Sequence, residues 1–367
     1  MFELPPLVDQ HCHGVLLGEL GLGSFETHLT ESAAPAAPGT TFFDTQTGFA
    51  VRRWCPPLLG LDPYASPARY LARRRELGAY ETGRKLLGAT GIGTFLVDTG
   101  LRGDLTGPGE LALAAGGEAH EIVRLELLAE QVADTSGTAE SFVTNLAEAV
   151  HVAAQSAAGF KSIAAYRHGL ALAPEPPGPG AVLRAAGEWL AARRPEGRLT
   201  DPVLLRHLLW SAVASGLPLQ LHTGFGDPDL RLDRADPVLL TDFVRATEGL
   251  GCDLVLLHGY PYHREAGYLA AMFPHVYADM GLTLTHTGAR AKAVLAEMLE
   301  LTPFGKLLFS TDGYALPELF VVGARLFRSA VGELLGEWVR DGSWAYEDAR
   351  RVAGMIAAGN ARRVYGL

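Results

Sequence analysis

Asp253-Leu-Val-Leu-Leu-His258 is an unbroken apolar run that ends in a histidine. Such a run is typical of a strand buried on both faces, as the strands of a parallel sheet are. Similar short segments alternate with longer stretches of helical spacing along all 367 residues. This alternation predicts a parallel sheet with crossover helices, and one α/β barrel can use the whole length. The eight predicted strands are residues 7–13, 92–98, 122–128, 160–165, 217–222, 254–258, 276–279 and 307–311.

The segments between these strands predict helices and one long insertion. Asp236-Pro237 is typical of an N-cap followed by proline at the first helical position. The predicted helices are residues 139–154, 236–250, 263–273, 288–301, 317–339 and 346–365. We predict a single domain over residues 1–367, with residues 20–90 as an insertion after the first strand. This insertion is either a lid at the mouth of the barrel or a helical subdomain that only packs. The proline-rich residues 173–179 predict a surface loop within the domain.

Composition narrows the class of protein. The residues are 48% hydrophobic, which is enough for a large core, and the net charge of −10 argues against non-specific binding to nucleic acid or to an anionic membrane. The three cysteines, an odd number and widely spaced, do not form a disulfide framework. Met1-Phe-Glu-Leu-Pro-Pro lacks the regions of a signal peptide, and no apolar stretch is long enough for a membrane span. We therefore expect a cytoplasmic protein acting on a small-molecule substrate, with a homo-oligomer left open.

The first predicted strand ends in a candidate metal-binding motif, Val8-Asp-Gln-His-Cys-His13. Side chains two apart in a strand point to the same face, so His11 and His13 project together while Cys12 points into the packing. Two imidazoles on one face can chelate a divalent metal. Further polar residues follow the ends of other predicted strands: His222, His258 and Asp312. Because parallel barrel strands all end at one mouth, these groups can meet around one or two metal ions.

Lys161 lies in the apolar fourth predicted strand, and only four of the 31 basic residues are lysine. A buried lysine is costly unless it is neutralised, paired or linked to a metal. Three roles stay open. The lysine is carbamylated by CO₂ and bridges two metals, it polarises substrate as an ammonium, or it pairs with a carboxylate such as Glu126.

Five longer motifs give the chain a family resemblance. They are Gly159-Phe-Lys-Ser-Ile-Ala-Ala-Tyr-Arg-His-Gly-Leu170, Gln220-Leu-His-Thr-Gly-Phe-Gly-Asp227, Leu257-His-Gly-Tyr-Pro-Tyr-His-Arg-Glu-Ala-Gly-Tyr-Leu269, Ser310-Thr-Asp-Gly313 and Gly359-Asn-Ala-Arg-Arg-Val-Tyr365. With these motifs the chain resembles the amidohydrolase superfamily, amidohydrolase-2 branch. Within it, the chain is most similar to the amidohydrolase domain of FluG and nodulin-type proteins, where that domain is fused to a glutamine-synthetase-like domain. Because the chain ends at Leu367, we expect a stand-alone enzyme or one whose synthetase-like partner is a separate chain.

This resemblance implies a (β/α)8 TIM barrel that holds one or two divalent metal ions, with zinc expected and manganese or iron as alternatives. The implied metal ligands are His11, His13, His222, His258 and Asp312, with Lys161 on the strand that carries the bridging lysine in many binuclear relatives. His258 is a ligand of a second metal or a catalytic group in members with one metal. Asp312 is the implied acid–base residue.

The implied reaction is hydrolysis of a C–N amide bond by metal-activated water. Asp312 would take the proton from water and deliver it to the leaving nitrogen. Arg167 is a candidate for binding a substrate carboxylate or, equally, for a loop salt bridge. His263 and Arg264 either contact substrate or start the next helix, which we favour.

The substrate is not fixed by these residues. The partner domain of the relatives indicates glutamate nitrogen chemistry, and a γ-glutamyl amide or a related small carboxylated amide is the specific hypothesis. One alternative is a metal-dependent, non-oxidative decarboxylase of an unsaturated or aromatic acid. A second alternative is a regulatory binding module without turnover, against which the complete His/Asp set argues.

Overall fold

The computed structural model describes residues 3–194 and 197–367. It contains eight strands that follow their chain order in one sheet, with parallel pairing wherever the register is defined. Between β1 and the segment after β8, the Gln10 amide donates to the Phe309 carbonyl (3.2 Å) and the Asp312 amide to the His11 carbonyl (3.1 Å). The segment that follows the last strand is therefore bonded to the first strand, and the sheet nearly closes into a (β/α)8 barrel. The strands are β1 Leu7–Cys12, β2 Ile92–Asp98, β3 Glu118–Arg124, β4 Gly159–Ser162, β5 Leu219–Thr223, β6 Leu254–His258, β7 Val276–Asp279 and β8 Leu307–Leu308.

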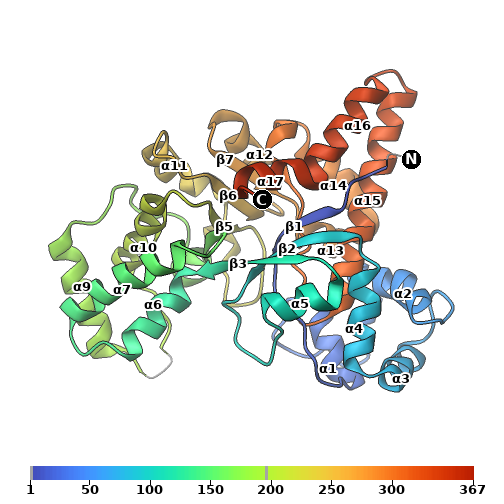
Figure 1. Cartoon of the computed structure of the whole chain (residues 1–367), viewed down its shortest axis with the longest axis horizontal. Coiled ribbons are helices and arrows are strands. Elements are labelled where there is room, and N and C mark those ends of the chain that lie inside the picture. Colours follow the sequence, from blue (N-terminus) through green and yellow to red (C-terminus); the bar gives the residue numbers. More distant parts are fainter. Residues whose placement is uncertain (1–2, 195–196) are drawn as a thin grey trace. The chain divides into compact units, whose positions relative to one another are not determined.

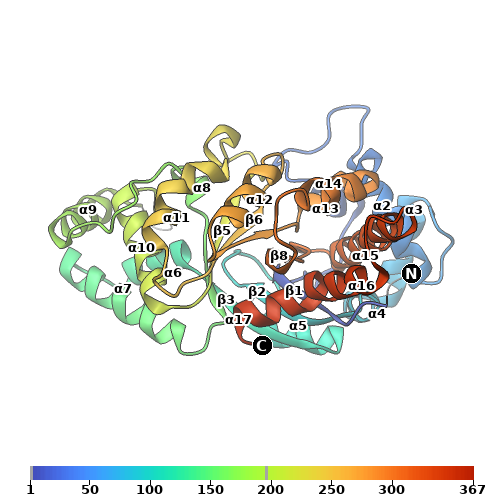
Figure 2. The ribbon, with the colours of Figure 1, turned by 90° about the horizontal axis from the view of Figure 1, so that it is seen from above.

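Helices lie between the strands, as Figures 1 and 2 show. The α-helices are α1 Leu22–Glu26, α2 Gln46–Leu58, α3 Pro67–Leu77, α4 Ala79–Gly88, α5 Pro108–Ala115, α6 Leu125–Asp134, α7 Ala139–Ala154, α8 Ala164–Arg167, α9 Pro179–Ala192, α10 Pro202–Ser215, α11 Thr241–Thr247, α12 His263–Met272, α13 Thr283–Thr287, α14 Ala291–Met298, α15 Pro317–Arg340, α16 Tyr346–Gly354 and α17 Asn360–Tyr365. The 3₁₀ turns are η1 Thr27–Leu29, η2 Phe42–Asp44, η3 Leu232–Arg234, η4 Pro237–Leu240, η5 Gly288–Arg290 and η6 Phe304–Lys306, and Met355–Gly359 is a π-helical turn. In the described ranges no helix has the length and apolar character needed to cross a bilayer.

The chain forms two compact units. The first contains the chain up to His120, Asp279–Arg363 and Leu367, and the second contains Glu121–Ala278 and Val364–Gly366. Within the first unit, the long helix α15 packs against α2, α4 and α14 (Figure 2). Within the second, α7 packs against α6, α9 and α10 (Figure 1).

Local chemistry explains several predicted boundaries. α7 covers the predicted residues 139–154, and the Thr138 hydroxyl caps it by accepting from the Ser141 amide (3.1 Å). Asp236 is an N-cap, as predicted, with its carboxylate accepting from the Val238 amide (3.0 Å). The helix that follows is shorter than predicted, because it starts as the 3₁₀ turn η4 and ends with α11 at Thr247.

Three strand predictions need correction. Residues 122–128 do not form one strand, because β3 ends at Arg124 and the helix-favouring Leu125-Glu126 start α6. β4 ends at Ser162 rather than 165, since residues 164–167 turn into α8. β8 is only two residues long, because the Thr311 amide bonds to a side chain, that of Asp9, instead of extending a strand ladder.

The inserted segment, residues 20–90, is largely helical and contains α1, α2, α3 and α4. Its contact with the rest of the first unit includes a fully buried carboxylate, Glu318 of α15. Arg74 of α3 approaches this carboxylate at 2.9 Å, and the Tyr70 hydroxyl donates to it at 2.7 Å. The segment is therefore fixed to α15 by a buried ion pair.

Candidate metal centre

β1 places both histidines of the first motif beside one carboxylate. The His11 Nε2 atom lies 3.2 Å from Asp312 Oδ1, and the His13 Nε2 atom lies 3.4 Å from the same oxygen. All six β1 residues are buried, and Cys12 packs with its thiol toward the Leu96 carbonyl, as the alternation predicts. His11, His13 and Asp312 thus converge within the first unit.

A hydrogen bond orients the His13 ring. Its Nδ1 atom lies 2.9 Å from the backbone carbonyl oxygen of Asp98, at the end of β2. With Nδ1 bonded there, Nε2 is the ring nitrogen that faces Asp312. A hydrogen bond of this kind, from the ring nitrogen that does not face the metal, fixes the tautomer of metal-binding histidines. His11, His13 and Asp98 also offer ligand atoms that lie within 4.8 Å of one another.

Asp9 holds the segment that carries Asp312. Its Oδ1 accepts from the Thr311 amide (2.8 Å), and its Oδ2 accepts from the Thr311 hydroxyl (2.5 Å). The Thr311 hydroxyl in turn accepts from the Gly313 amide (2.9 Å). Asp312 lies between these contacts with φ of 51°, a conformation that is strained for a residue with a side chain. Hydrogen bonds from Asp9 on β1, the strand that also carries both histidines, stabilise this strained backbone conformation.

Acidic groups surround this part of the first unit. The pKa of Asp9 is raised to about 8, mainly by burial; the Thr311 bonds oppose this shift, and the negative charges of Asp279 and Asp312 add to it. Asp279, at the end of β7, accepts from the Gly281 amide (2.9 Å) and the Ser310 hydroxyl (3.0 Å). A concentration of buried carboxylates of this kind favours a bound cation.

The second unit contains the other two predicted histidine ligands. His222 and His258 are buried near the ends of β5 and β6, and their ring centroids are 4.8 Å apart. The Tyr166 ring packs on His222 with a centroid distance of 4.5 Å. His258 has φ of 68°, so the chain turns sharply at the end of β6. The two rings are therefore neighbours, as the strand-end prediction requires.

The remaining predicted residues also lie in the second unit. Lys161 is only 2% exposed on β4, which confirms that this lysine is buried. Glu126 is not on β3 as predicted but in the first turn of α6. Its Oε1 accepts from the Ser162 hydroxyl (2.6 Å) and the Ile163 amide (3.0 Å), and burial raises its pKa.

Arg167 ends the short helix α8, and its Nη2 lies 3.3 Å from Glu130 Oε1. This contact is the salt bridge that the sequence offered as one of two roles for Arg167. His263 begins α12, as the favoured alternative predicts, and its ring stacks on Tyr260 with centroids 5.4 Å apart. Arg264 is exposed on the first turn of the same helix.

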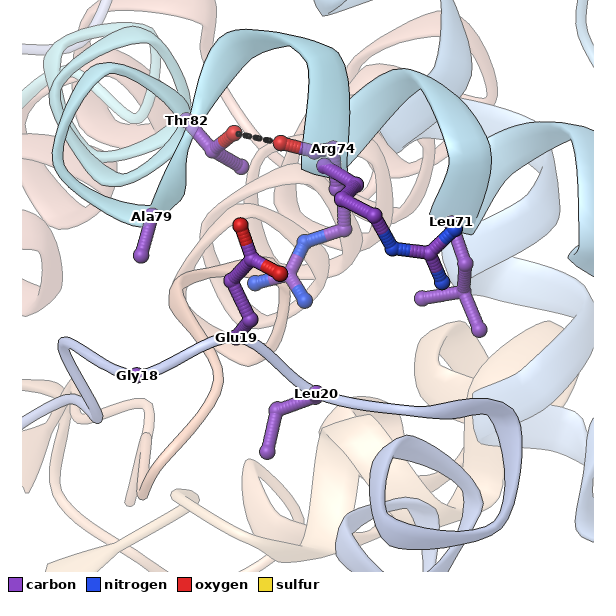
Figure 3. A pocket seen from close by; sticks show the side chains of 8 residues that line it. Gly18, Glu19, Leu20, Leu71, Arg74, Ala79 and Thr82 are labelled. Atoms are coloured by element: carbon purple, nitrogen blue, oxygen red, sulfur yellow. Dashed lines mark hydrogen bonds between the residues drawn. The ribbon is translucent and has the colours of Figure 1, made fainter.

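The structure also has a surface pocket, and the predicted site residues do not line it. It lies in the first unit and contains Glu19, Arg74 and Thr82 among its lining residues (Figure 3). The Thr82 hydroxyl donates to the Arg74 carbonyl at its wall. The pocket thus belongs to the inserted segment rather than to the His/Asp cluster.

The donor set of the first unit fits a divalent metal ion. Two ligand atoms bound at about 2.0–2.1 Å to a tetrahedral zinc lie roughly 3.3 Å apart. The separations of Asp312 Oδ1 from the two Nε2 atoms, 3.2 and 3.4 Å, have this size. Imidazole and carboxylate groups are also the ligands expected for zinc, manganese or iron. His11, His13 and Asp312 would therefore hold such an ion.

Two histidines on the first strand of a barrel, beside an aspartate that follows the eighth strand, are the arrangement that the family resemblance implies. Residues 110–367 match the model of the amidohydrolase family. The chain belongs to this family.

Three known proteins are similar to the chain in sequence or in fold. Protein fluG of Emericella nidulans is 35% identical over 243 residues, which are 62% of this chain and 28% of that protein, so the chain matches little more than a quarter of its relative. A crystal structure from Lactobacillus casei ATCC 334, provisionally described as a metal-dependent hydrolase, is 27% identical with a TM-score of 0.86 over 99% of this chain and 95% of that one. A uronate isomerase from Bacillus halodurans C-125 shares the fold alone, at 13% identity and a TM-score of 0.62 over 99% of this chain and 93% of that chain.

Sequence reasoning missed three acidic residues near the cluster. Asp9 lies in the quoted first motif, and the period of two already places it on the face of His11. Asp98 and Asp279 end β2 and β7, so the strand-end rule that selected the histidines also applies to them. The strand-end rule was applied only to the predicted strands that end in histidine or are followed by Asp312, although it also points to Asp98 and Asp279.

Proposed function

We propose that the protein is a metal-dependent hydrolase that cleaves a C–N amide bond of a small carboxylated amide, with a γ-glutamyl amide as the specific substrate. The observation that carries the proposal is the position of Asp312 Oδ1 within 3.2 and 3.4 Å of the two Nε2 atoms on β1. A binding module has no need for such a set of ligands around one point. Membership of the amidohydrolase family supports the same class of reaction.

Zinc is the proposed metal, and His11 and His13 hold it together with Asp312. When bound, such an ion supplies Lewis acidity and brings the pKa of a coordinated water toward 7. Asp312 accepts a proton from the attacking water and passes it to the leaving nitrogen. Its side chain is 13% exposed, so it is reachable by substrate, whereas His11 is fully buried and serves only to bind.

Four residues of the second unit have predicted roles in this reaction. His222 is a further ligand, and His258 is a ligand or the group that polarises the scissile carbonyl. Lys161 is the candidate bridging or substrate-polarising residue. Arg167 would bind a substrate carboxylate, and for this it would have to share its guanidinium with Glu130, its partner at 3.3 Å.

Product analysis tests the reaction class. The zinc- or manganese-loaded protein is incubated with a panel of γ-glutamyl amides, and the products are separated and identified. We expect release of glutamate and an amine, with activity lost in Asp312→Asn although zinc stays bound. The Glu188→Gln variant, which changes an exposed carboxylate of α9, is the control and retains activity. Release of CO₂ from unsaturated acids without amide cleavage would instead establish a decarboxylase and refute the proposal.

A further inference from the structure

Tyr166 is a half-buried aromatic residue that packs on a predicted metal ligand. It lies in the short helix α8, just after β4, and its ring centroid is 4.5 Å from that of His222, with the ring planes at 54°. His222 also contacts the ring of His258, at a centroid distance of 4.8 Å. The two histidines are only 5% and 1% exposed, whereas Tyr166 is partly accessible to solvent. Tyr166 is therefore the most exposed of the three, and it does not simply fill the core.

The backbone that carries Tyr166 is fixed by a buried carboxylate. Glu126 accepts from the Ser162 hydroxyl (2.6 Å) and from the Ile163 amide (3.0 Å). The same hydroxyl accepts from the Ala164 amide (3.1 Å), and the Tyr166 amide donates to the Ile163 carbonyl (2.9 Å). The start of α8 is thus bonded to a residue of α6, and the position from which the Tyr166 side chain extends is defined.

The hydroxyl end of Tyr166 rests against the loop that follows β5. A Cβ atom added at Gly226 would lie 1.9 Å from the Tyr166 hydroxyl oxygen and 3.3 Å from Cε1 of His222, so only glycine leaves room for the phenol here. The loop is held in turn, because the Phe225 amide donates to the Tyr260 carbonyl (2.7 Å). The Tyr166 ring is therefore restrained at both of its ends.

The imidazole of a strand-end histidine is not oriented by its backbone alone. Rotation about the bond between Cβ and the ring is broad in histidine, so neighbouring groups decide which nitrogen faces a metal ion. The bond to the Asp98 carbonyl does this for His13. At His222, rotation of the imidazole is limited by the Tyr166 ring, whose centroid is 4.5 Å away.

We propose that Tyr166 is a positioning residue that fixes the imidazole orientation of His222 for metal binding. The inference rests on the proposed function for one detail, that His222 is a metal ligand. The contact with His222 is made ring to ring, so the aromatic ring rather than the hydroxyl group performs this role. Phenylalanine should therefore replace Tyr166, whereas leucine should not.

Crystal structures of the full chain, grown without added metal, test the orientation directly. In Tyr166→Phe the His222 ring should keep its wild-type orientation, and in Tyr166→Leu it should take another rotamer or several. Gly226→Ala, which displaces the phenol in a chain that keeps Tyr166, should have the same effect. Trp210→Leu is the control, because it removes a half-buried ring that packs on Phe243 at 5.9 Å and should leave His222 in place.

Zinc affinity measures the consequence of this orientation. In competition with a chromophoric chelator, Tyr166→Leu should bind zinc about 10–100-fold more weakly than the wild type, as when other residues that orient metal ligands are replaced. Tyr166→Phe and Trp210→Leu should stay close to the wild-type affinity. In a His222→Ala protein, Tyr166→Leu should cause no further loss, because it acts through the ring that is already absent.

The outcomes separate the positioning role from the reaction. If His222 keeps its orientation in Tyr166→Leu, or if this change weakens zinc binding equally with and without His222, the inference is refuted. If His222→Ala binds zinc as tightly as the wild type, the ligand role of His222 fails, and the crystal structures still decide whether Tyr166 orients the ring. A panel of γ-glutamyl amides left uncleaved would refute the proposed reaction without affecting either result.

Discussion

Replacing Asp9 tests how the strand that carries the histidines also positions Asp312. Asp9→Ala removes both acceptors of Thr311, the one at 2.8 Å from its amide and the one at 2.5 Å from its hydroxyl. Each of the two buried donors left without an acceptor costs about 1–3 kcal/mol, so the free energy of unfolding should fall by about 2–6 kcal/mol. The turn at Asp312, with its φ of 51°, is then free to relax.

The metal affinity reports positioning separately from stability. We expect Asp9→Ala to bind zinc about 10–100-fold more weakly in competition with a chromophoric chelator, as when other residues that orient metal ligands are replaced. Asp9→Asn should lose much less, because its amide oxygen still accepts from the Thr311 amide and its NH₂ can donate to the Thr311 hydroxyl. Leu146→Ala, a core change in α7, is the control that loses about 2–4 kcal/mol of stability and keeps its zinc affinity.

One result would refute this reasoning. If Asp9→Ala unfolds at lower urea concentration but binds zinc as tightly as the wild-type protein, Asp9 contributes only to the fold. Asp312 would then reach its position without help from β1.

Three further predictions concern the surrounding structure. Glu126→Gln keeps the acceptor for Ser162 and removes the titrating group. Because burial raises the folded-state pKa of Glu126, the stability that its protonated form gives is lost as the pH rises from its unfolded-state pKa of about 4.3 through the raised folded-state pKa. The wild-type free energy of unfolding should therefore fall relative to that of the variant as the pH is raised over this range, and a difference that does not change with pH in urea unfolding would contradict the prediction. Arg74→Met leaves Glu318 buried without its ionic partner, and the free energy of unfolding measured in urea should fall by about 3–5 kcal/mol. A fall of less than about 1 kcal/mol would show that this ion pair is not essential for holding the inserted segment on α15. Gly226→Ala places a Cβ atom 1.9 Å from Tyr166 Oη, so Tyr166 has to leave its position on His222. The melting temperature should therefore fall, and Tyr166→Phe should restore part of it. A variant as stable as the wild type would show that the backbone around Gly226 can move without cost.

The sequence predicted those features that depend on local periodicity. The period of two on the first strand placed His11 and His13 together and Cys12 in the packing, and the apolar run before His258 marked β6 with its observed bounds. The ends of β3, β4 and β8 could not be predicted in this way. The end of β3 reflects the helix preference of Leu125-Glu126, which the strand prediction overlooked. The ends of β4 and β8 depend on contacts between distant residues, because Glu126 accepts from the amide of Ile163 and Asp9 accepts from the amide of Thr311.

The contacts of the inserted segment were beyond sequence reasoning for a similar reason. The ring of His28 packs on that of Tyr314, which lies almost 300 residues further along the chain, and no periodicity links the two. The inserted segment could be recognised from its length and predicted as a lid or a packing subdomain, but which of its side chains approaches Tyr314 depends on tertiary packing. Whether the segment opens and closes stays a prediction.

The central claim is that His11, His13 and Asp312 bind one metal ion, and anomalous diffraction from crystals of the zinc-loaded protein, recorded on both sides of the zinc absorption edge, tests it most directly. The account predicts a zinc peak in contact with Nε2 of His11, Nε2 of His13 and the Asp312 carboxylate. A zinc peak bound by other residues, or stoichiometric zinc that persists in a His11→Ala/His13→Ala protein, would contradict it.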